Sequence, residues 1–417
     1  MFKNSLKLGF FLGSRQIYRA NIWTNVLIIA VMVLTFLNLV FVSGILLGLP
    51  EGASRALKAQ YSGDVIVKSL ETKNYIQKTP AILKYLESLE EVKDISPRYL
   101  VGSKVEANYR TKTNPYDKSD QVNATIAGID PIKEDAVTKL KDFVVDGEYL
   151  HSTDTNSIMV GSRLLAKYSR VQEPGLTLLD NVELGDKVRI KIGDFSKEYT
   201  VKAVLKNKVE LVSSRIFMLD TELRKILERS DYGANEISMT LNKGSSPEKI
   251  VEIMEKSPYA NLAKYQTWQE AQGSFFKDIQ LTFGILGNVI GSIGLAVATI
   301  TIFIVIYINA ITRKKHIGIL KGIGVHREAI EISYVLQSLF YCLTGTLIGS
   351  IILFKFLVPF FDANPIDFPF SDGILAISAS STSIRVAVLI FTTFLAGYFP
   401  ASIITRKNTL DTILDRD

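Results

Sequence analysis

The sequence predicts a helical membrane protein with four transmembrane helices and one large periplasmic α+β domain inserted between helices 1 and 2. Two observations predict this fold class. Apolar residues make up 47% of the 417-residue chain while charged residues still make up 22%, and the two kinds are segregated into blocks. Four apolar runs are separated by polar segments, one of which, 50–278, is long enough to form a domain by itself.

The first apolar run covers 22–49 and contains no charged residue. A helix needs roughly 20 apolar residues to cross the hydrocarbon core of a bilayer, so this run is long enough. A cleaved signal peptide is the alternative, since basic residues precede the run, but the apolar part of a signal peptide is only about 7–15 residues long. We therefore predict an uncleaved first transmembrane helix that follows an N-terminal segment, 1–21.

The other three predicted transmembrane helices cover 279–312, 332–358 and 384–404. The first two of these contain GxxxG steps, at Gly287 and Gly291 and at Gly345 and Gly349. Glycines at this spacing let another helix approach closely, although glycine is also generally common in membrane helices. We predict that these four glycines are helix-packing positions.

Basic residues in the short segments predict the orientation, because cytoplasmic loops carry an excess of lysine and arginine. They occur before the first helix and in 313–331: Lys3, Lys7, Arg15, Arg19, Arg313, Lys314, Lys315, Lys321 and Arg327. The 359–383 loop contains aspartates but no lysine or arginine. We therefore expect a multi-pass protein of the cell inner membrane with 313–331 and both termini, including the 405–417 tail, in the cytoplasm. The 50–278 and 359–383 segments would face outward.

The 50–278 segment is too polar for a membrane and too regularly patterned to be disordered. Strand-like runs occur at 64–68, 104–109, 123–129, 187–192, 199–205, 215–219 and 236–241. Amphipathic helical stretches occur at 81–91, 162–168, 221–228 and 247–256. The residues Gly193 to Ser196 predict a hairpin turn. Helical stretches at 53–60 and 267–278 would continue the adjacent membrane helices outward as two stalks.

The sequence contains little that points to catalysis. The single cysteine, Cys342, lies in an apolar run and is expected to be a buried apolar side chain. Neither the three histidines nor the carboxylates form a metal-ligand spacing, and hydrolase motifs are absent. Basic residues form no stripe for nucleic acid. The sequence also has no Gly-Lys dipeptide, which the phosphate-binding loop of an ATPase requires. We expect no catalytic residue, metal or cofactor, and any ATP chemistry must come from a partner.

The segment 313–330 has the most informative pattern. Its apolar residues lie between basic ones: Ile317, Leu320, Val325 and Ile330. This pattern predicts a short amphipathic helix at the inner surface, ended or kinked by Gly322 and Gly324. The spacing favours equally an anchor for anionic lipid headgroups and a helix that docks on a partner protein.

The same segment resembles the signature R-x-x-E-I-G-I-L-[KR]-A-[LI]-G-A-x-x-x-x-I of FtsX-like permeases, the membrane subunits of macrolide-exporter and lipoprotein-releasing ABC systems. The matching residues are Arg313, Ile317, Gly318, Ile319, Leu320, Lys321, Ile323, Gly324 and Ile330. His316 replaces the usual glutamate and Gly322 the usual alanine. Near the C-terminus, Pro400, Ala401, Arg406 and Ile413 follow a second family pattern, from which Ile404 and Thr409 depart.

Segments of the predicted outer domain are similar, in order, to the LolC/LolE type of lipoprotein-releasing permease. These segments are 127–131, 147–150, 158–161, 164–166 and 185–188. Together with the layout of one helix, a domain and three helices, the resemblance covers nearly the whole chain.

The resemblance implies a mechanism of mechanotransmission. The 313–331 segment would be the coupling helix, seated in a groove of a cytoplasmic ABC ATPase, and two permease chains, identical or related, would join two ATPases. Ile317, Leu320 and Val325 would fill that groove, and Lys321 and Arg327 would contact its rim. His316, when neutral, could not pair with a partner arginine as a glutamate would. Movement passed along the stalks would release a lipoprotein to a periplasmic carrier.

Two other functions stay open within the same resemblance. A macrolide-exporter-like permease would move a peptide, antibiotic or other amphiphile and would pair with a periplasmic adaptor. An FtsX-like protein would instead regulate an extracellular cell-wall hydrolase, although such proteins typically have a much smaller outer domain.

Overall fold

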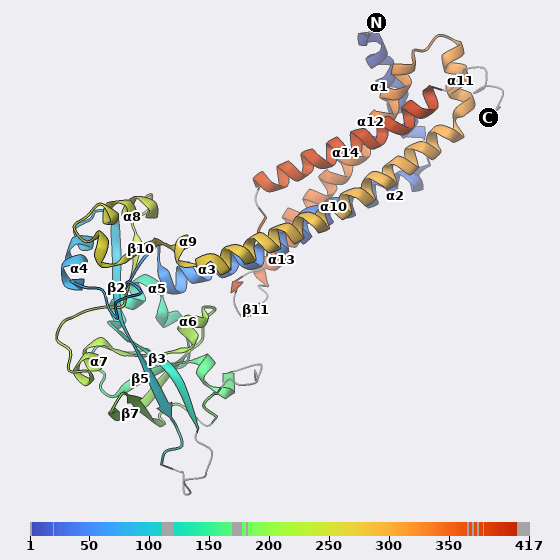
Figure 1. The fold of residues 1–417 in the computed structure, drawn as a ribbon. Helices are drawn as coiled ribbons and strands as arrows, with labels where there is room; N and C mark the ends of the chain where they lie inside the picture. Colours follow the sequence, from blue (N-terminus) through green and yellow to red (C-terminus); the bar gives the residue numbers. More distant parts are fainter. Residues whose placement is uncertain are drawn as a thin grey trace. The chain divides into compact units, whose positions relative to one another are not determined.

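The protein is described from a computed structural model that divides into two compact units, which we treat separately (Figure 1). The helical unit comprises Met1–Glu51, Asp278–Asp367 and Gly373–Asp417, and the mixed unit comprises Gly52–Lys277 and Phe368–Asp372. The structure describes residues 2–19, 21–110, 120–168, 177–180, 182–364, 367–368, 371–372, 375–377 and 379–406. Ile413, at the leucine position of the second family pattern, and Thr409, which departs from that pattern, lie outside these residues.

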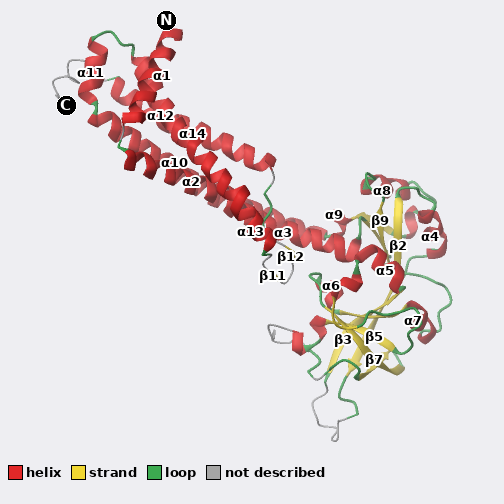
Figure 2. Cartoon of the chain, turned by 180° about the vertical axis from the view of Figure 1, so that it is seen from behind, coloured by secondary structure: helices red, strands yellow, loops and turns green. Residues whose placement is uncertain are grey.

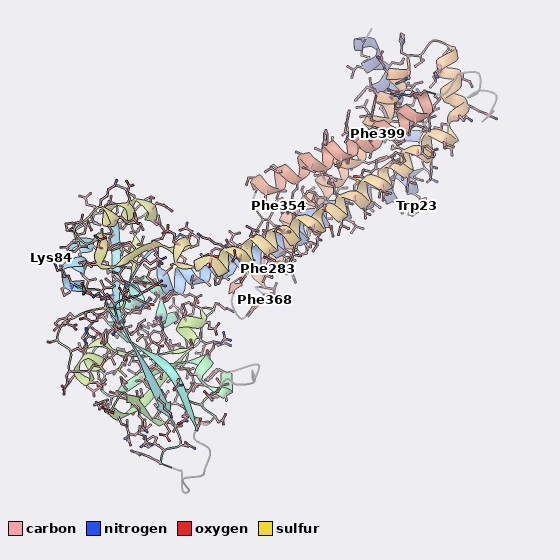
Figure 3. All side chains as sticks on the ribbon, viewed as in Figure 1. Trp23, Lys84, Phe283, Phe354, Phe368 and Phe399 are labelled. Atoms are coloured by element: carbon pink, nitrogen blue, oxygen red, sulfur yellow. The ribbon has the colours of Figure 1, made fainter. Side chains whose placement is uncertain are left out.

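Four helical stretches in the described residues are long and apolar enough to cross a membrane: Ile22–Ser62, Phe276–Thr312, Arg327–Ala363 and Ser380–Thr405. Their elements are α2 (Ile22–Leu37), α3 (Ser43–Leu57), α10 (Gly273–Thr312), α12 (Arg327–Ile352), α13 (Val358–Ala363) and α14 (Ala379–Thr405). π-helical turns join α2 to α3 and α12 to α13. Large side chains such as Trp23, Phe354 and Phe399 project outward from these helices (Figure 3), as expected for surfaces in contact with lipid.

Helix α12 packs closely against α2 through two of the predicted glycines. A Cβ atom added to Gly345 would lie 2.4 Å from the Cβ of Met32, and one added to Gly349 would lie 2.5 Å from the ring of Phe36. Both distances are too short for real atoms. The close approach of α2 and α12 therefore requires residues without side chains at 345 and 349.

Helix α10 packs on α3 and on the π-helical turn before it, Asn38–Val42, with more space at the other two predicted glycines. A Cβ on Gly287 would meet its nearest neighbour, the Cβ of Ser43, at 3.8 Å, which is ordinary contact. The Ser43 hydroxyl donates a hydrogen bond of 3.2 Å to the Gly287 carbonyl. A Cβ on Gly291 would lie 3.2 Å from Leu39. The two steps thus differ in how strictly they need glycine.

The N-terminal segment forms a helix, α1 (Phe2–Arg19), which the sequence analysis did not predict. Gly9 and Gly13 lie against α12, where added Cβ atoms would meet Ile332 at 2.7 Å and the carbonyl oxygen of Ser333 at 3.0 Å. The contact with α12 is made by glycines, and the rest of α1 includes polar and basic residues. The segment therefore contains no long apolar run from which a helix could have been predicted.

The mixed unit contains one ten-stranded sheet with the order β10-β1-β9-β2-β3-β8-β5-β7-β4, while β6 pairs with β2 and β7 (Figures 1 and 2). Its strands are β1 Val65–Lys68, β2 Val92–Glu106, β3 Gln121–Ile129, β4 Val144–Gly147, β5 Ser157–Gly161, β6 Lys187–Ile192, β7 Phe195–Leu205, β8 Arg215–Leu219, β9 Glu236–Leu241 and β10 Lys264–Thr267. Its helices are α4 Thr79–Glu87, α5 Pro131–Thr138, α6 Glu210–Ser213, α7 Asp220–Ile226, α8 Pro247–Glu255 and α9 Trp268–Ala271. Two short strands, β11 Asp367–Phe368 and β12 Ser371–Asp372, pair separately.

The sheet has two parts, which β2 connects. We call β1, β9, β10, α4 and α8 the β1 lobe, and β3 to β8 with α7 the β3 lobe. Up to Arg98 the strand β2 pairs with β9, and from Tyr99 onward it pairs with β3. Figure 2 shows β2 running from one part to the other. Each lobe has an apolar core. A further apolar cluster joins Ile66 of β1 and Tyr61 to residues of β3, β5, β7 and β8.

Most strand predictions are confirmed. The strands 187–192, 215–219 and 236–241 have the predicted bounds, and Ile192 pairs with Phe195 across the predicted hairpin. The helix predicted at 162–168 is wrong. Two 3-10 turns stand there, because the chain is extended at Leu165: the Leu179 N–H donates to the Leu164 carbonyl and the Ala166 N–H donates to the Leu179 carbonyl, both at 2.9 Å.

Both adjacent membrane-length helices continue beyond their predicted membrane spans. Helix α3 continues to Leu57 and a π-helical turn, Lys58–Ser62, follows it. On the other side α10 covers 273–278 of the predicted stretch, but a capping box at Thr267 begins the separate short helix α9, which ends at Ala271. Gly273, the first residue of α10, has φ +77°, a left-handed conformation that keeps α9 and α10 from forming one continuous helix.

Candidate coupling site

The segment predicted to couple to a partner forms one short helix, α11 (Lys314–Gly322), which follows Arg313. Its C-terminus is a Schellman motif: the Val325 N–H donates to the Leu320 carbonyl and the Gly324 N–H donates to the Lys321 carbonyl, both at 3.0 Å. Gly324 has φ +92°, which residues with a side chain rarely adopt. Of the two predicted breaks, Gly324 therefore ends the helix, while Gly322 is its last residue.

One face of α11 is buried in the helical unit. Ile317 is 3% exposed and belongs to an apolar cluster with residues of α2, α10, α12 and α14, including Ile330 and Ile404. Gly318 is also buried, and Leu320 and Val325 are half-buried against the same cluster. The expectation that Ile317 fills a partner's groove needs correction, because its side chain is already packed inside its own chain. Leu320 and Val325 are committed in part to the same packing.

The opposite face of α11 is exposed and is apolar at its centre. We define the outward face of α11 as Lys315, His316, Ile319, Gly322 and Ile323, which follow the helical spacing i, i+1, i+4, i+7 and i+8. Ile319 is 53% and Ile323 74% exposed. His316 was a predicted site residue, but the two isoleucines were not. Their helical spacing from Ile317, which puts them on nearly the opposite side, was the signal that could have found them.

Polar side chains fasten α11 to two neighbouring helices. The Lys321 Nζ donates to the backbone carbonyl of Thr405 in α14 at 3.1 Å. The Thr405 hydroxyl donates to Glu331 Oε1 of α12 at 2.7 Å, and Arg327 Nε donates to the same oxygen at 2.7 Å. Glu331 is buried. We call these four residues, Lys321, Arg327, Glu331 and Thr405, the Glu331 network. Lys321 and Arg327 were expected to contact the rim of a partner's groove, but in the structure they make contacts within their own chain.

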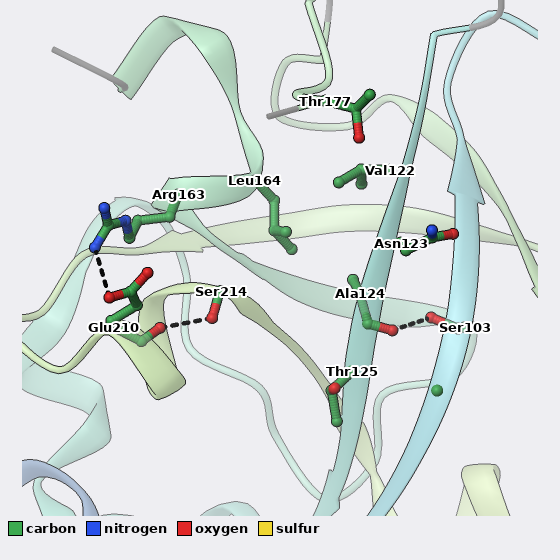
Figure 4. Close-up of a pocket in the computed structure, with 11 residues that line it drawn as sticks. Ser103, Val122, Asn123, Ala124, Thr125, Arg163, Leu164, Thr177, Glu210 and Ser214 are labelled. Carbon is green, nitrogen blue, oxygen red and sulfur yellow. Dashed lines mark hydrogen bonds and ion pairs between the residues drawn. The ribbon is translucent and has the colours of Figure 1, made fainter. Parts of the chain in front are cut away.

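The described residues contain no group of three or more histidine, cysteine or carboxylate side chains that could hold a metal ion. The Cys342 thiol is buried. A cleft of about 470 Å³ lies in the β3 lobe between β2, β3 and α6 (Figure 4). Its charged lining residues, Arg163 and Glu210, pair with each other at 3.3 Å. Two of its serine hydroxyls donate to backbone carbonyls, Ser103 to Ala124 at 2.8 Å and Ser214 to Glu210 at 2.6 Å.

The architecture and the site define a class of protein: a polytopic helical membrane protein with a large mixed domain and an exposed amphipathic helix between its second and third membrane-length helices. Residues 28–257 match the family description "MacB-like periplasmic core domain". Residues 288–409 match the description "FtsX-like permease C-terminal". The first match covers more than half of the chain, so the chain belongs to the family of ABC transporter permeases with a MacB-like core domain and an FtsX-like C-terminal part.

Individual relatives are more distant. The chain is 26% identical over 239 residues to an uncharacterized ABC transporter permease of Methanocaldococcus jannaschii, a match that covers 56% of this chain and 58% of that relative. The matched stretch thus spans less than two thirds of the relative's length. The crystal structure of the periplasmic region of MacB from Actinobacillus actinomycetemcomitans aligns with a TM-score of 0.36 and 10% identity, over 52% of this chain and 94% of that one.

The comparisons confirm the predicted ABC transporter permease of the FtsX and MacB type. The narrower prediction is a lipoprotein-releasing permease of the LolC/LolE type. The comparisons do not distinguish this type from the other members of the family. It therefore stays a prediction.

Proposed function

We propose that this chain is the permease subunit of an ABC transporter in which ATP hydrolysis by a cytoplasmic partner drives movement of the mixed domain on the other side of the membrane. The observation that carries this proposal is the outward face of α11, with Ile319 and Ile323 exposed at its centre. Apolar side chains exposed on a helix that also packs on its own protein are typical of a protein contact. The sequence has no phosphate-binding Gly-Lys of its own.

The occupant of this face is the ATPase subunit. Ile319 and Ile323 enter its groove, and the cationic Lys315 and the imidazole of His316 lie at the rim. A helix seated by two apolar anchors with polar neighbours follows the usual helix-in-groove mode of recognition. The excess of basic residues in 313–331 supports a cytoplasmic position for this face, on the side of the membrane where the nucleotide is.

The Glu331 network passes the movement of α11 to the membrane helices. Lys321 of α11 reaches α14 through Thr405, and Thr405 reaches α12 through Glu331. A displacement of α11 by the ATPase therefore moves the inner ends of α12 and α14 with it. Two permease chains, identical or related, and two ATPases form the complete transporter.

The substrate that we propose is a lipid-modified protein, released from the membrane to a periplasmic carrier. The support is the ordered similarity of segments in the mixed unit, 127–131, 147–150 and 158–161 among them, to lipoprotein-releasing permeases. Export of a peptide or other amphiphile through a periplasmic adaptor is the alternative, and the identity of the outer partner separates the two.

The experiment compares a double variant, Ile319→Asp with Ile323→Asp, with the wild-type chain and with Ile132→Asp, which changes an exposed isoleucine of the mixed unit. Each tagged chain is purified from native membranes in mild detergent. The wild type and Ile132→Asp should retain an ATP-hydrolysing subunit, and the double variant should lose it while inserting in the membrane normally. Retention of the ATPase by the double variant would refute the assignment of this face.

A further inference from the structure

The first membrane-length helical stretch, Ile22–Ser62, ends inside the mixed unit at a buried tyrosine. Tyr61 is 2% exposed. Its hydroxyl donates to Glu236 Oε1 at 2.6 Å. Its backbone carbonyl accepts from Arg98 Nη2 at 2.8 Å and from the Ser238 hydroxyl at 3.0 Å. The last turn of the helix is thus held by both its side chain and its backbone.

Four buried charges surround this tyrosine. Arg98 pairs with Glu134 at 2.7 Å and with Glu236 at 3.6 Å, and Arg215 pairs with Glu236 at 3.1 Å. The guanidinium carbons of Arg98 and Arg215 lie 5.2 and 5.4 Å from the centre of the Tyr61 ring, within the range of a cation–π interaction. We call these five residues the Tyr61 network.

The network lies where the two lobes of the mixed unit join. Arg98 is the residue of β2 after which this strand changes its partner from β9 to β3. Glu236 begins β9 in the β1 lobe, and Arg215 begins β8 in the β3 lobe. Glu134 comes from α5, which packs on β2 and on the helix end. Tyr61 therefore contacts groups from both lobes at once.

Buried ion pairs are a poor means of gaining stability, because well-packed apolar residues of the same volume do as well or better. Removing one partner of such a network is costly, because it leaves a buried charge without compensation. Since the network stands both at the helix end and at the lobe junction, a displacement of the helix end acts on both lobes through it.

We propose that Tyr61 is a positioning residue, the pivot through which displacement of the first membrane helix changes the angle between the β1 lobe and the β3 lobe. This inference rests on the proposed function, because ATP-driven movement supplies the displacement. The inference names Tyr61 as the point at which that movement enters the mixed unit. It also names the resulting motion, which is a rotation of the two lobes about residues 98 and 99 of β2.

The test measures the distance between the lobes in the full chain, assembled with its ATPase in lipid nanodiscs. Spin labels are attached at Lys84→Cys on α4 (labelled in Figure 3) and Lys225→Cys on α7, both exposed positions, with Cys342→Ala as background. Electron–electron distance distributions are recorded without nucleotide and with ATP and vanadate. ATP hydrolysis is measured on the same samples.

The decisive variant is Tyr61→Phe, which removes the hydroxyl that bonds Glu236 and keeps the ring. Tyr265→Phe is the matched control, because the buried Tyr265 also loses a hydroxyl bond, to the Tyr259 carbonyl at 2.9 Å, but within the β1 lobe alone. The wild type and Tyr265→Phe should change their lobe distance with nucleotide. Tyr61→Phe should hydrolyse ATP and melt within a few degrees of the control but lose that change.

A lobe distance that changes equally in Tyr61→Phe and the wild type would overturn the pivot. So would a wild-type distance that nucleotide does not alter. If nucleotide does not alter the wild-type distance, ATP hydrolysis by the Ile319→Asp/Ile323→Asp double variant separates the two proposals. Hydrolysis that is reduced in this variant would leave the proposed function standing without the pivot. Hydrolysis equal to that of the wild type would overturn both the pivot and the proposed function.

Discussion

Ile317 and Ile319 are two residues apart on α11, yet the first is buried in the core of the helical unit and the second is exposed. A helix turns by about 100° per residue, so positions two apart point to nearly opposite sides. One side of α11 therefore attaches it to its own chain, and the other side, with Ile319 and Ile323, is exposed.

The two isoleucines should respond differently to the same substitution. Ile317→Asp places a carboxylate in an apolar cluster without a partner, which costs several kcal/mol, so we expect a lower melting temperature and poor insertion. Ile319→Asp should leave the melting temperature unchanged and weaken binding of the ATPase. Thermal unfolding in detergent and co-purification of the ATPase measure the two effects. Equal loss of stability in both variants would contradict the assignment of the two faces.

The end of α11 should depend on Gly324 but not on Gly322. Gly324→Ala forces a residue with a Cβ into φ +92°, which costs about 1–3 kcal/mol. Gly322→Ala is the control, since its added Cβ meets nothing within 4 Å and its backbone is helical; it should be neutral or stabilise by about 0.5–1 kcal/mol. Chemical denaturation of the purified chain gives both values, and a harmless Gly324→Ala would rule out the Schellman motif.

The glycines of the membrane helices should tolerate alanine to different degrees. Gly345→Ala and Gly349→Ala introduce atoms closer than 2.6 Å to Met32 and Phe36, and overpacking of this kind costs about 1–3 kcal/mol. Gly287→Ala should be tolerated, because its nearest contact would be 3.8 Å. The free energy of unfolding in mixed micelles ranks the three variants. If Gly287→Ala lowered it most, the described packing of α12 on α2 would be wrong.

The Tyr61 network should make the mixed unit sensitive to acid. Burial alone would raise the pKa of Glu236, but the charges of Arg215 and Arg98 lower this pKa from 4.5 to about 2. A carboxyl whose pKa is lower in the folded than in the unfolded protein stabilises the fold above the unfolded pKa. That contribution, roughly 3 kcal/mol, is therefore lost as the pH falls from about 4.5 towards 2.

Acid titration of the free energy of unfolding tests this expectation. Glu236→Gln should be less stable than the wild type at neutral pH, and the gap should narrow below about pH 4.5. Glu252→Gln is the control, because Glu252 is an exposed carboxylate paired with Lys256 on α8. A constant gap between Glu236→Gln and the wild type across this range would show that the carboxylate does not carry the effect.

Several features of the protein were determined by the sequence alone, because they depend on local physics. An uncharged run of sufficient length can bury its backbone hydrogen bonds in lipid only as a helix, so the four membrane-length helices were predictable. Strands such as 215–219 follow from their β-branched and aromatic residues, and Gly324 follows from the conformation that ends a helix.

Other features were decided only by the tertiary structure. The faces of α11 depend on which neighbouring helices cover Ile317. The helix predicted at 162–168 is replaced by turns because Leu164 and Ala166 form backbone hydrogen bonds with Leu179. The Tyr61 network joins residues as distant in sequence as Tyr61 and Glu236, and no local pattern connects them. Buried charges pair wherever the fold brings them together, since only proximity in space offsets the cost of removing them from water.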